Sequence, residues 1–546
     1  MDESPVENAV APTENGGAVP IEASLATVGS GFSFSAQLYR NIESFPGQVS
    51  ITPPIMTARR ENKISRRDAV RQSRHVERSN AHIHGGINRK VDMVVGSQLR
   101  MQSIPEWELL GLTKEWKKSF SRACELQFGS WANGSRKLQD AEGDSDFGGL
   151  MWLAFRHAMG PDGECYGIIH YDQDRANEYG TRWATFVQIL DPQRIATPPE
   201  KEGDATVYEG HQLDKHGRTI GFWVQKDDIA EDPLGTTQYF YVPRETPDGR
   251  PIGFHWFFKE RAGAKRGISR MITALRQSLM LDQFDDAQLS SAIVSAVLAM
   301  HIKSTQDPET VAEMLAPAAN GGESAFDRKV AYYDKVKIRI GQQRLPVLGP
   351  NDEIVMAAVN RAAADPTAFR TGFLRYFASA LETTHSSISS NHADMNYSNA
   401  RSELLETWRT VISERARFAS GPPRLVWNAV IEEAVFKGYI AMPAGAPLFR
   451  EMRDAYTRCW VMGPGMSEID PVKAAEANKI ELETRTTTRQ AIAAAKGRDY
   501  LEDFDQLAEE NEEAEARDLE LEPEKAPVAP AAAAKTYPSD PQQPEP

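Results

Sequence analysis

Cysteine is scarce in this sequence. The chain of 546 residues has three cysteines, which are far apart and form no CxxC pair: Cys124, Cys165 and Cys459. This spacing argues against a disulfide framework and against a cysteine-based structural zinc site. We expect Cys165, on an alternating strand, to be a buried structural residue rather than a nucleophile. A reducing, cytoplasmic setting fits this composition, and the acidic N-terminus lacks the pattern of a secretion signal.

The familiar nucleotide-binding and hydrolase loops are also missing. The sequence contains no GxxxxGK[ST], GxGxxG or GxSxG pattern, so it lacks the signatures of common ATPases, dehydrogenases and serine hydrolases. The uncharged stretch 287–302 falls short of the roughly 20 apolar residues that a bilayer requires, and it carries a glutamine and three serines. We therefore expect no membrane contact, although a pore-forming oligomer built on this stretch is an alternative.

Basic residues are fewer than acidic residues overall, but they are concentrated in residues 58–78. The net charge is −15, and residues 499–525 account for −11 of it, with thirteen acidic residues against two basic ones. We expect residues 1–30 and the acidic, Pro- and Ala-rich tail 501–546 to be disordered, although the acidic stretch after Asp499 is either a helix or coil. Residues 58–78 hold eight basic residues and predict a helix, whose basic face either contacts phosphate or is simply solvated.

The run from Gly267 to Ser304 has no proline and no internal glycine. It predicts a helix from Ile268 to Lys303 that would be about 50 Å long. One face carries small residues, which let helices approach closely. This helix is either the centre of a large domain or a stem packed against copies of itself. In the second case its contact residues are Ala292, Ser295, Ala296 and Ala299.

The rest of the chain predicts an α+β protein. Residues 103–139 and 148–160 read as helices, and residues 164–258 as strands of an antiparallel or mixed sheet. Residues 305–364 form an insert with a strand pair, which precedes a helix over 365–380. A polar loop over 386–399 leads into an amphipathic helix, and residues 422–462 predict further helices. Asp470 is placed to cap a final helix that has Pro471 in its first turn.

A metal site was considered at the histidine pair of an HxH pattern, His82 and His84. A metal-dependent hydrolase that uses this pair with Asp68 is the enzymatic alternative. Nothing nearby in the sequence supplies the further ligands that such a site needs. We therefore predict no catalytic residues, no metal and no cofactor.

Four segments, in order, resemble the lambda-type family of tailed-phage portal proteins. They are an arginine-rich helix that ends in Val-Val-Gly, a His…Arg…Arg-Gly segment, a Tyr-Ser-x-x-Arg segment and a late Trp…Gly…Asp-Pro-x-Lys segment. Two departures occur: Ala264–Lys265 stands where the family has Gln, and Asn399 replaces a second serine. The matching residues are Arg67, Arg71, Gly96, His255, Arg261, Arg266, Gly267, Tyr397, Ser398, Arg401, Asp470, Pro471 and Lys473.

The resemblance implies a portal-protein fold, built in sequence order. The expected parts are a mixed α/β wing (31–265), a first stem helix (266–304), a small β-containing clip (305–364) and a second stem helix (365–384). A tunnel loop with its following helix (385–420) and a helical crown (421–500) complete it. The expected channel residues are Ser386, Ser389, Asn391, Asp394 and Asn396; their loop has no Lys or Arg and would hold phosphate weakly.

The resemblance also implies a role without catalysis. Such proteins form a ring, usually a dodecamer, at one capsid vertex. Double-stranded DNA passes through the ring during packaging and ejection. The implied partners are the terminase large subunit, a head-completion or adaptor protein, and the major capsid and scaffolding proteins. The implied location is the virion, with the host cytoplasm during assembly.

Overall fold

The computed structural model describes residues 44–45, 48–49, 55–226, 238–298, 339–340, 343–344, 366–391, 396–466 and 470–519. The chain divides into two units, Met1–Met56 and Thr57–Pro546. In the first unit, β1 (Ser44–Phe45) pairs antiparallel with β2 (Gln48–Val49). The predicted disorder of residues 1–30 lies outside the described residues.

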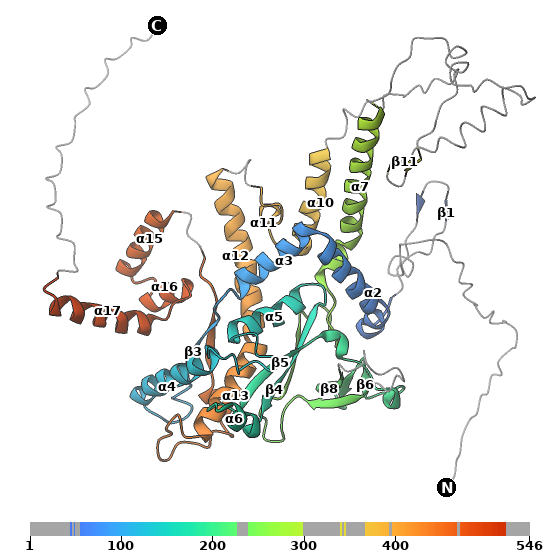
Figure 1. Cartoon of the computed structure of the whole chain (residues 1–546). Coiled ribbons are helices and arrows are strands. Elements are labelled where there is room, and N and C mark those ends of the chain that lie inside the picture. The colour runs from blue at the N-terminus through green and yellow to red at the C-terminus, as the bar shows by residue number, and fades with distance from the viewer. Residues whose placement is uncertain are drawn as a thin grey trace, which may run out of the picture. The chain divides into compact units, whose positions relative to one another are not determined.

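The second unit is mixed helix and sheet, which confirms the α+β prediction (Figure 1). Its larger sheet has the order β6-β7-β8-β9, and a second has the order β10-β4-β5, with antiparallel neighbours in both. The strands are β4 (Glu164–Tyr171), β5 (Thr185–Leu190), β6 (Val207–Tyr208), β7 (His211–Leu213), β8 (Thr219–Gln225), β9 (Tyr239–Pro243) and β10 (Gly253–Phe257). Short helices lie between the strands: α6 (Gln173–Tyr179), η1 (Pro192–Arg194) and η2 (Pro199–Lys201).

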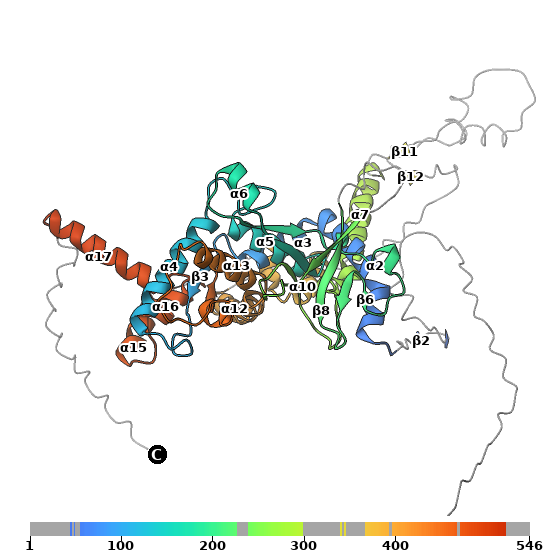
Figure 2. The ribbon, with the colours of Figure 1, turned by 90° about the horizontal axis from the view of Figure 1, so that it is seen from below.

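Two consecutive helices, separated by the single residue Asn80, come before the sheets. Asn80 ends α2 (Ala58–Ser79) and caps α3 (Ala81–Val94), because its side chain accepts from the amides of His82 and Ile83. β6 lies beside the start of α2 (Figure 2), where the Tyr208 hydroxyl donates to the Arg59 carbonyl at 2.5 Å. Two further helices, α4 (Lys114–Ala132) and α5 (Phe147–Met159), occupy part of the predicted helical regions.

The main core lies among α4, α5, the β4–β5 sheet and α13 (Pro422–Phe436). Phe128, Phe147 and Trp427 meet there, with ring centroids 4.9–5.0 Å apart around Phe128. α13, at the start of the predicted crown (421–500), is buried nearly all round. Its buried carboxylates have partners: Glu433 accepts from the amides of Ala184 and Thr185, and Glu432 pairs with Arg453.

Two distant segments form a small sheet, in which β13 (Cys459–Met462) pairs antiparallel with β3 (Arg100–Ser103). The helix predicted over 422–462 is therefore wrong for 459–462, and the helix predicted over 103–139 begins too early at Ser103. The pairing joins positions more than 350 residues apart in the chain. No local pattern specifies such a partner, and tertiary packing therefore decides the state of these short apolar segments. α14 (Arg453–Tyr456) precedes β13.

The long helix begins later than predicted. A 3₁₀ turn, η4 (Arg270–Thr273), comes first, and α7 (Leu275–Leu298) follows; residues 299–303 lie outside the described residues. The helix starts late because contacts fix the residues before it. Ser269 donates to the Gly160 carbonyl at 2.9 Å, and Arg270 pairs with Glu414 at 2.7 Å. The chain leaves these anchors as a tight turn, in which the Ala274 amide donates to Met271.

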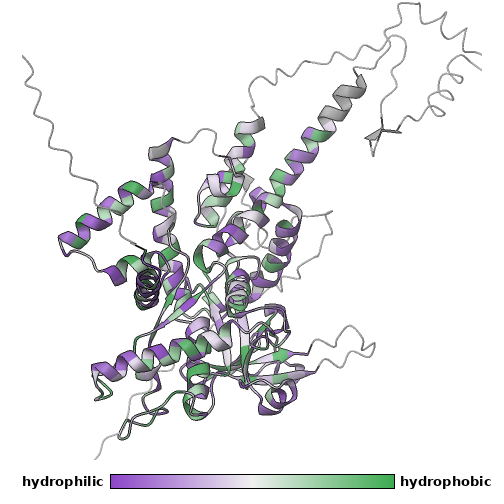
Figure 3. Cartoon of the chain, turned by 60° about the vertical axis from the view of Figure 1, so that its left-hand side comes forward, coloured by the Kyte–Doolittle hydropathy of each residue, from purple (hydrophilic) through white to green (hydrophobic). Residues whose placement is uncertain are grey.

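α10 (Pro366–Ala380) lies beside α7, as expected for two helices that flank an insert (Figure 1). Phe284 and Phe369 are 4.6 Å apart between ring centroids, and Arg370 pairs with Asp285 at 3.3 Å. Hydrophilic and hydrophobic residues are mixed along α7 (Figure 3). Of the predicted clip, the described part is the hairpin of β11 (Arg339–Ile340) and β12 (Gln343–Arg344), which lies in the predicted strand pair. No helix among the described residues is long and apolar enough for a membrane span.

The chain continues through α11 (His385–Ser389), α12 (Tyr397–Ala419) and α13, and ends with α15 (Pro471–Glu483), α16 (Arg489–Ala495) and α17 (Tyr500–Ala516). The tail from residue 501 was assigned to disorder, with helix or coil left open for its acidic start, and α17 shows that this start is a helix. Asp499 caps it and accepts from the Gln102 side chain at 3.0 Å, and Glu502 pairs with Arg100 at 2.8 Å. The acidic composition masked these contacts with β3. Residues 520–546 lie outside the described residues.

The junction of α4 with α17 gives the first testable prediction. Burial, reinforced by Asp499 and Glu502, raises the pKa of Glu125 to about 7 although the Ser103 amide donates to it. The folded chain therefore holds a proton on Glu125 that the unfolded chain has lost, and stability falls as pH rises from the ordinary value of 4.5 to about 7. Glu125→Gln should remove this pH dependence and stabilise the protein above about pH 7 by up to about 3 kcal/mol.

Chemical denaturation between about pH 5 and about pH 8 measures this effect. Glu115→Gln, an exposed site on the same helix, is the matched control and should leave the wild-type pH dependence unchanged. If Glu125→Gln keeps the wild-type slope, Glu125 is not the titrating group.

Candidate functional site at the base of α7

One buried carboxylate gathers the segments from which α7 departs. Glu164 is at the start of β4 and is 0% exposed. Arg266 binds it through two nitrogens, with Nη2 at 2.6 Å and Nε at 2.8 Å from Oε1. Arg66 of α2 lies 3.3 Å from Oε1, and His255 of β10 lies 3.1 Å from Oε2. The Gly267 amide donates to Oε2 at 2.9 Å. Three elements and the chain leading into η4 therefore meet at Glu164.

The electrostatics of this cluster favour the charged carboxylate. Burial by itself raises the pKa of Glu164, but Arg266, His255 and Arg66 more than offset this and hold the pKa well below its usual range. Burial lowers the pKa of His255, although Glu164 opposes the shift. Because an ionised carboxylate can only accept, the His255 Nε2 donates to Glu164. The ring of His255 also stacks on Tyr166, with centroids 4.2 Å apart.

Arg266 has a partner for each of its side-chain nitrogens. Its Nη1 donates to the Glu209 carbonyl at 2.7 Å and to the Ile195 carbonyl at 3.2 Å, and its Nη2 also donates to the Pro192 carbonyl at 3.2 Å. Gly267 has no space for a side chain, since a Cβ would lie 2.1 Å from the Gly163 carbonyl oxygen. The charged side chains of the cluster are almost completely withdrawn from solvent and are paired with one another, so its chemistry is that of an anchor rather than of a reaction centre.

Arg261, the third matching residue of this segment, ties the same loop to α2. It pairs with Glu61, and the Asn62 side chain donates to the Arg266 carbonyl at 3.0 Å. The predicted residues Arg261, Arg266 and Gly267 thus act together. Their partners Glu164 and Arg66 were missed, because nothing in the local sequence marks Glu164 as the partner of a residue 102 positions away.

A second buried cluster holds the other side of the same base. Glu414 of α12 pairs with Lys90 of α3 at 3.0 Å and with Arg270 of η4 at 2.7 Å. Lys90 also donates to the Glu382 carbonyl at 2.9 Å, just after α10. Burial raises the pKa of Glu414, although Lys90 and Arg270 oppose the shift. The entry to α7 and the exit from α10 are therefore fixed to the same two helices.

The first and fourth matching segments also touch each other. Gly96 has a positive φ of 70°, and a Cβ there would lie 2.8 Å from the Pro464 ring. Arg415 of α12 clamps this junction by donating to the carbonyls of Val94 at 2.8 Å and Pro464 at 2.9 Å. Burial lowers the pKa of Arg415 to about 10. Sequence reasoning missed Arg415.

The remaining matching residues are on the surface. Arg67 and Arg71 are exposed on α2, and Arg71 pairs with Asp68 at 2.9 Å. Tyr397 is the first residue of α12, on which Ser398 and Arg401 are exposed. The predicted cap is confirmed: Asp470 accepts from the Lys473 amide, pairs with its ammonium group at 3.0 Å, and is followed by Pro471 at the first position of α15.

The predicted tunnel segment is partly helical. α11 packs against α3, where Ile388 is buried beside Gly86, and Arg89 of α3 donates to the Ser387 carbonyl and to the Ser390 hydroxyl at 2.6 Å. Ser386 is buried and donates to Glu403 at 2.8 Å, so its hydroxyl is already engaged within the chain.

The other predicted channel residues have three different placements. Ser389 is half-buried and donates to the His385 carbonyl at 2.9 Å. Asn391 and Asn396 are exposed, and Asn396 caps α12. Asp394 lies outside the described residues. The segment itself has no Lys or Arg. A cation nevertheless contacts it, because Arg89 of the distant helix α3 binds Ser387 and Ser390.

The predicted stem contacts are only partly described. Ala292, Ser295 and Ala296 are in α7, but their side chains, and Ala299 entirely, lie outside the described residues. The alternative metal pair is not assembled around a common point. His84 lies 3.1 Å from Asn88, and Asp68 pairs with Arg71. Residues two apart on a helix face different ways. Within the described ranges, no group of three His, Cys, Asp or Glu residues could hold a metal ion.

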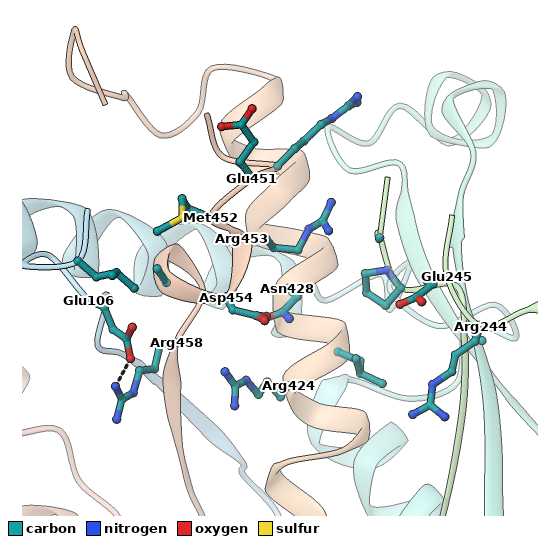
Figure 4. Close-up of a pocket in the computed structure, with 17 residues that line it drawn as sticks. Glu106, Arg244, Glu245, Arg424, Asn428, Glu451, Met452, Arg453, Asp454 and Arg458 are labelled. Carbon is teal, nitrogen blue, oxygen red and sulfur yellow. Dashed lines mark hydrogen bonds and ion pairs between the residues drawn. The ribbon is translucent and has the colours of Figure 1, made fainter. Parts of the chain in front are cut away.

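A cavity of about 680 Å³ lies where α13, the turn between β9 and β10, and the α14 segment meet (Figure 4). Arg453 ties its walls together by pairing with Glu432 at 2.9 Å and donating to the Asp248 carbonyl at 3.0 Å. Arg450 also pairs with Asp248, and Arg458 pairs with Glu106. Most of its arginines hold the joint together, and the cavity mixes both signs of charge.

The comparisons with known proteins agree on one family. The family model described as "Phage portal protein, lambda family" matches residues 47–415. The portal protein of Escherichia phage N15 and portal protein B of Escherichia phage lambda are each 28% identical over 450 residues, which cover 81% of this chain and 83% of each relative. The family match includes the Glu164 and Glu414 clusters and stops before the fourth segment.

Two solved structures are similar at 11% identity. The neck of a native gene transfer agent particle computed with C12 symmetry has a TM-score of 0.36 and covers 78% of this chain and 92% of that chain. The neck of an empty particle computed with C6 symmetry has a TM-score of 0.39 and covers 79% and 94%.

Proposed function

Because this chain belongs to the lambda family of phage portal proteins, we propose that it is one subunit of a closed ring, a dodecamer, at a single capsid vertex. The observation that carries the proposal is the family match over residues 47–415. Double-stranded DNA passes through this ring during packaging and leaves through it during ejection. The terminase large subunit docks first, and the head-completion protein and tail replace it.

The two buried clusters suit a part that bears load. A motor that drives DNA through a ring also pushes on the ring, and α7 and α10 carry that force between the clip and the wing in this proposal. Glu164 and Glu414 fix the entry to α7 and the exit from α10 to α2, α3, β4 and α12. Removing one partner of such a buried ion pair strongly lowers the free energy of unfolding. The base of α7 therefore resists deformation in this proposal.

The role is structural rather than catalytic. The ionisable groups gathered at the base of α7 are committed to one another in ion pairs. The bore is lined by the segment around Ser389, Asn391, Asp394 and Asn396. Short neutral side chains and one carboxylate, with no Lys or Arg in the segment, give weak contacts with phosphate, which a moving duplex needs. The ring assembles in the host cytoplasm together with the capsid and scaffolding proteins. It then remains in the virion.

Assembly tests the proposal through the small face of α7. Ser295→Trp should abolish or strongly reduce ring formation, because overpacking a close helix contact costs roughly 1–3 kcal/mol per site and every interface of the ring repeats it. Light scattering measures the assembled mass, and Ser295→Ala is the control. Circular dichroism shows whether the monomer is still folded. A Ser295→Trp variant that assembles like the wild type would show that this face is not at a subunit contact.

A further inference from the structure

One exposed face of α2 is uniformly basic. We call it the α2 basic face; its residues recur every three or four positions, and all are exposed: Arg60, Lys63, Arg67, Arg71, His75 and Arg78. Residues at this spacing lie on one side of a helix. At 1.5 Å per residue the row is about 27 Å long.

The cations on the two sides of α2 differ in their ion pairing. On the inner side, Arg66 pairs with Glu164, and Arg74 pairs with Asp162 and Asp191, both at 2.7 Å. On the α2 basic face, the only ion pair among the described residues is that of Arg71 with Asp68 in the same helix. This contrast arises in a chain that has 77 acidic residues against 62 Lys and Arg. Apart from Arg71, the cations of this face thus have no acidic partner in the part of the chain that the structure describes.

The surroundings add to the positive potential. Besides burial, the nearby charges of Lys259 and Arg59 lower the pKa of Lys265, which places these three cations close together near the start of α2. Lys265 donates to the Gly217 carbonyl and has no carboxylate partner among the described residues. The row has no Phe, Tyr or Trp, so it lacks the large aromatic side chains on which the bases of a single strand stack.

We propose that the α2 basic face binds the phosphate backbone of double-stranded DNA, as a holding site separate from the bore. A long row of Arg and Lys at intervals of roughly 5 Å matches a regular polyanion, and arginine forks pair well with phosphate. The contact would be independent of sequence, because contacts to phosphate carry no sequence information. It goes beyond the proposed function, in which the bore must hold DNA weakly.

The test is duplex binding by the full-length protein at several salt concentrations. The probe is a fluorescent DNA duplex of about 40 base pairs, long enough to span the row, and anisotropy gives the affinity. The variant replaces Arg60, Lys63, Arg67, Arg71 and Arg78 with glutamine, which has a similar helix propensity. The matched control replaces five other basic residues on α4 and α12: Lys114, Lys117, Lys118, Arg409 and Arg417.

The α2 variant should lose at least tenfold in affinity at low salt, and its log–log salt slope should be shallower by up to about 4, since each phosphate contact contributes about 0.9. The control variant should bind like the wild type. Equal losses in both variants would show that net charge alone governs binding. If the wild type ignores the duplex but binds polyglutamate through α2, the face docks an acidic protein and the proposal fails. Light scattering on the same samples reports ring assembly, so failure of the proposed ring is detected separately.

Discussion

Arg266→Met should destabilise the protein by roughly 3–5 kcal/mol, because it leaves Glu164 ionised and fully buried without its main partner. Methionine keeps most of the side-chain length, so the loss reports on charge and hydrogen bonding. Chemical denaturation measures the change in the free energy of unfolding. The matched control is Arg261→Met in the same segment, where the ion pair with Glu61 is largely exposed and the cost should be at most about 1 kcal/mol.

The double variant Arg266→Met with Glu164→Gln separates charge from packing. Removing the uncompensated carboxylate should recover a large part of the loss, since an unpaired buried charge costs more than a neutral amide. If Glu164→Gln gives no recovery, the defect lies in the carbonyl contacts of Arg266 instead. The lowered pKa of Glu164 also sets a pH dependence: its contribution is complete above its ordinary pKa near 4.5 and is lost as pH falls below that value.

Asn391→Lys combined with Asp394→Lys should leave rings intact and reduce DNA packaging many-fold at low salt. Each subunit would place two extra cations in the proposed bore, and the ring multiplies them. Every engaged phosphate then adds salt-dependent affinity, with a slope near −0.9 per contact, which resists movement. The measurement is DNA packaged per prohead as a function of salt. The defect should shrink as salt rises, because screening weakens these contacts.

The control for this prediction is Asn391→Gln with Asp394→Gln, which adds length without positive charge. It should package DNA nearly as well as the wild type. A lysine variant that packages normally at low salt, with its rings confirmed, would remove the segment 385–396 from the bore. A defect that does not respond to salt would point to a lost protein contact.

The fold class and part of the Glu164 cluster could be predicted from the sequence alone. Arg261, Arg266 and Gly267 were marked by the resemblance, and Asp470 and Pro471 by capping chemistry that operates within one turn. These signals are either local or attached to a recognised motif. The strand pairing of 459–462 with 100–103 could not be found this way, and the sequence could not decide between helix and coil over 500–516, because distant partners stabilise both.

The site itself was out of reach for the same reason. Glu164 becomes important only when β4, β10, α2 and the segment before η4 meet, and no spacing in the sequence encodes that meeting. Ser386 was read as channel-lining because it stands among polar residues. Folding instead buries it against Glu403. A polar composition describes a segment as a whole and does not assign a place to each of its side chains.

Electron cryomicroscopy of the purified full-length protein tests the central claim most directly. We predict closed rings with an open centre, in which α7 of one subunit contacts α7 or α10 of the next and the segment 385–396 faces the bore. Particles that are monomeric, open or filamentous under assembling conditions, or rings in which the segment 385–396 faces outward, would contradict the account.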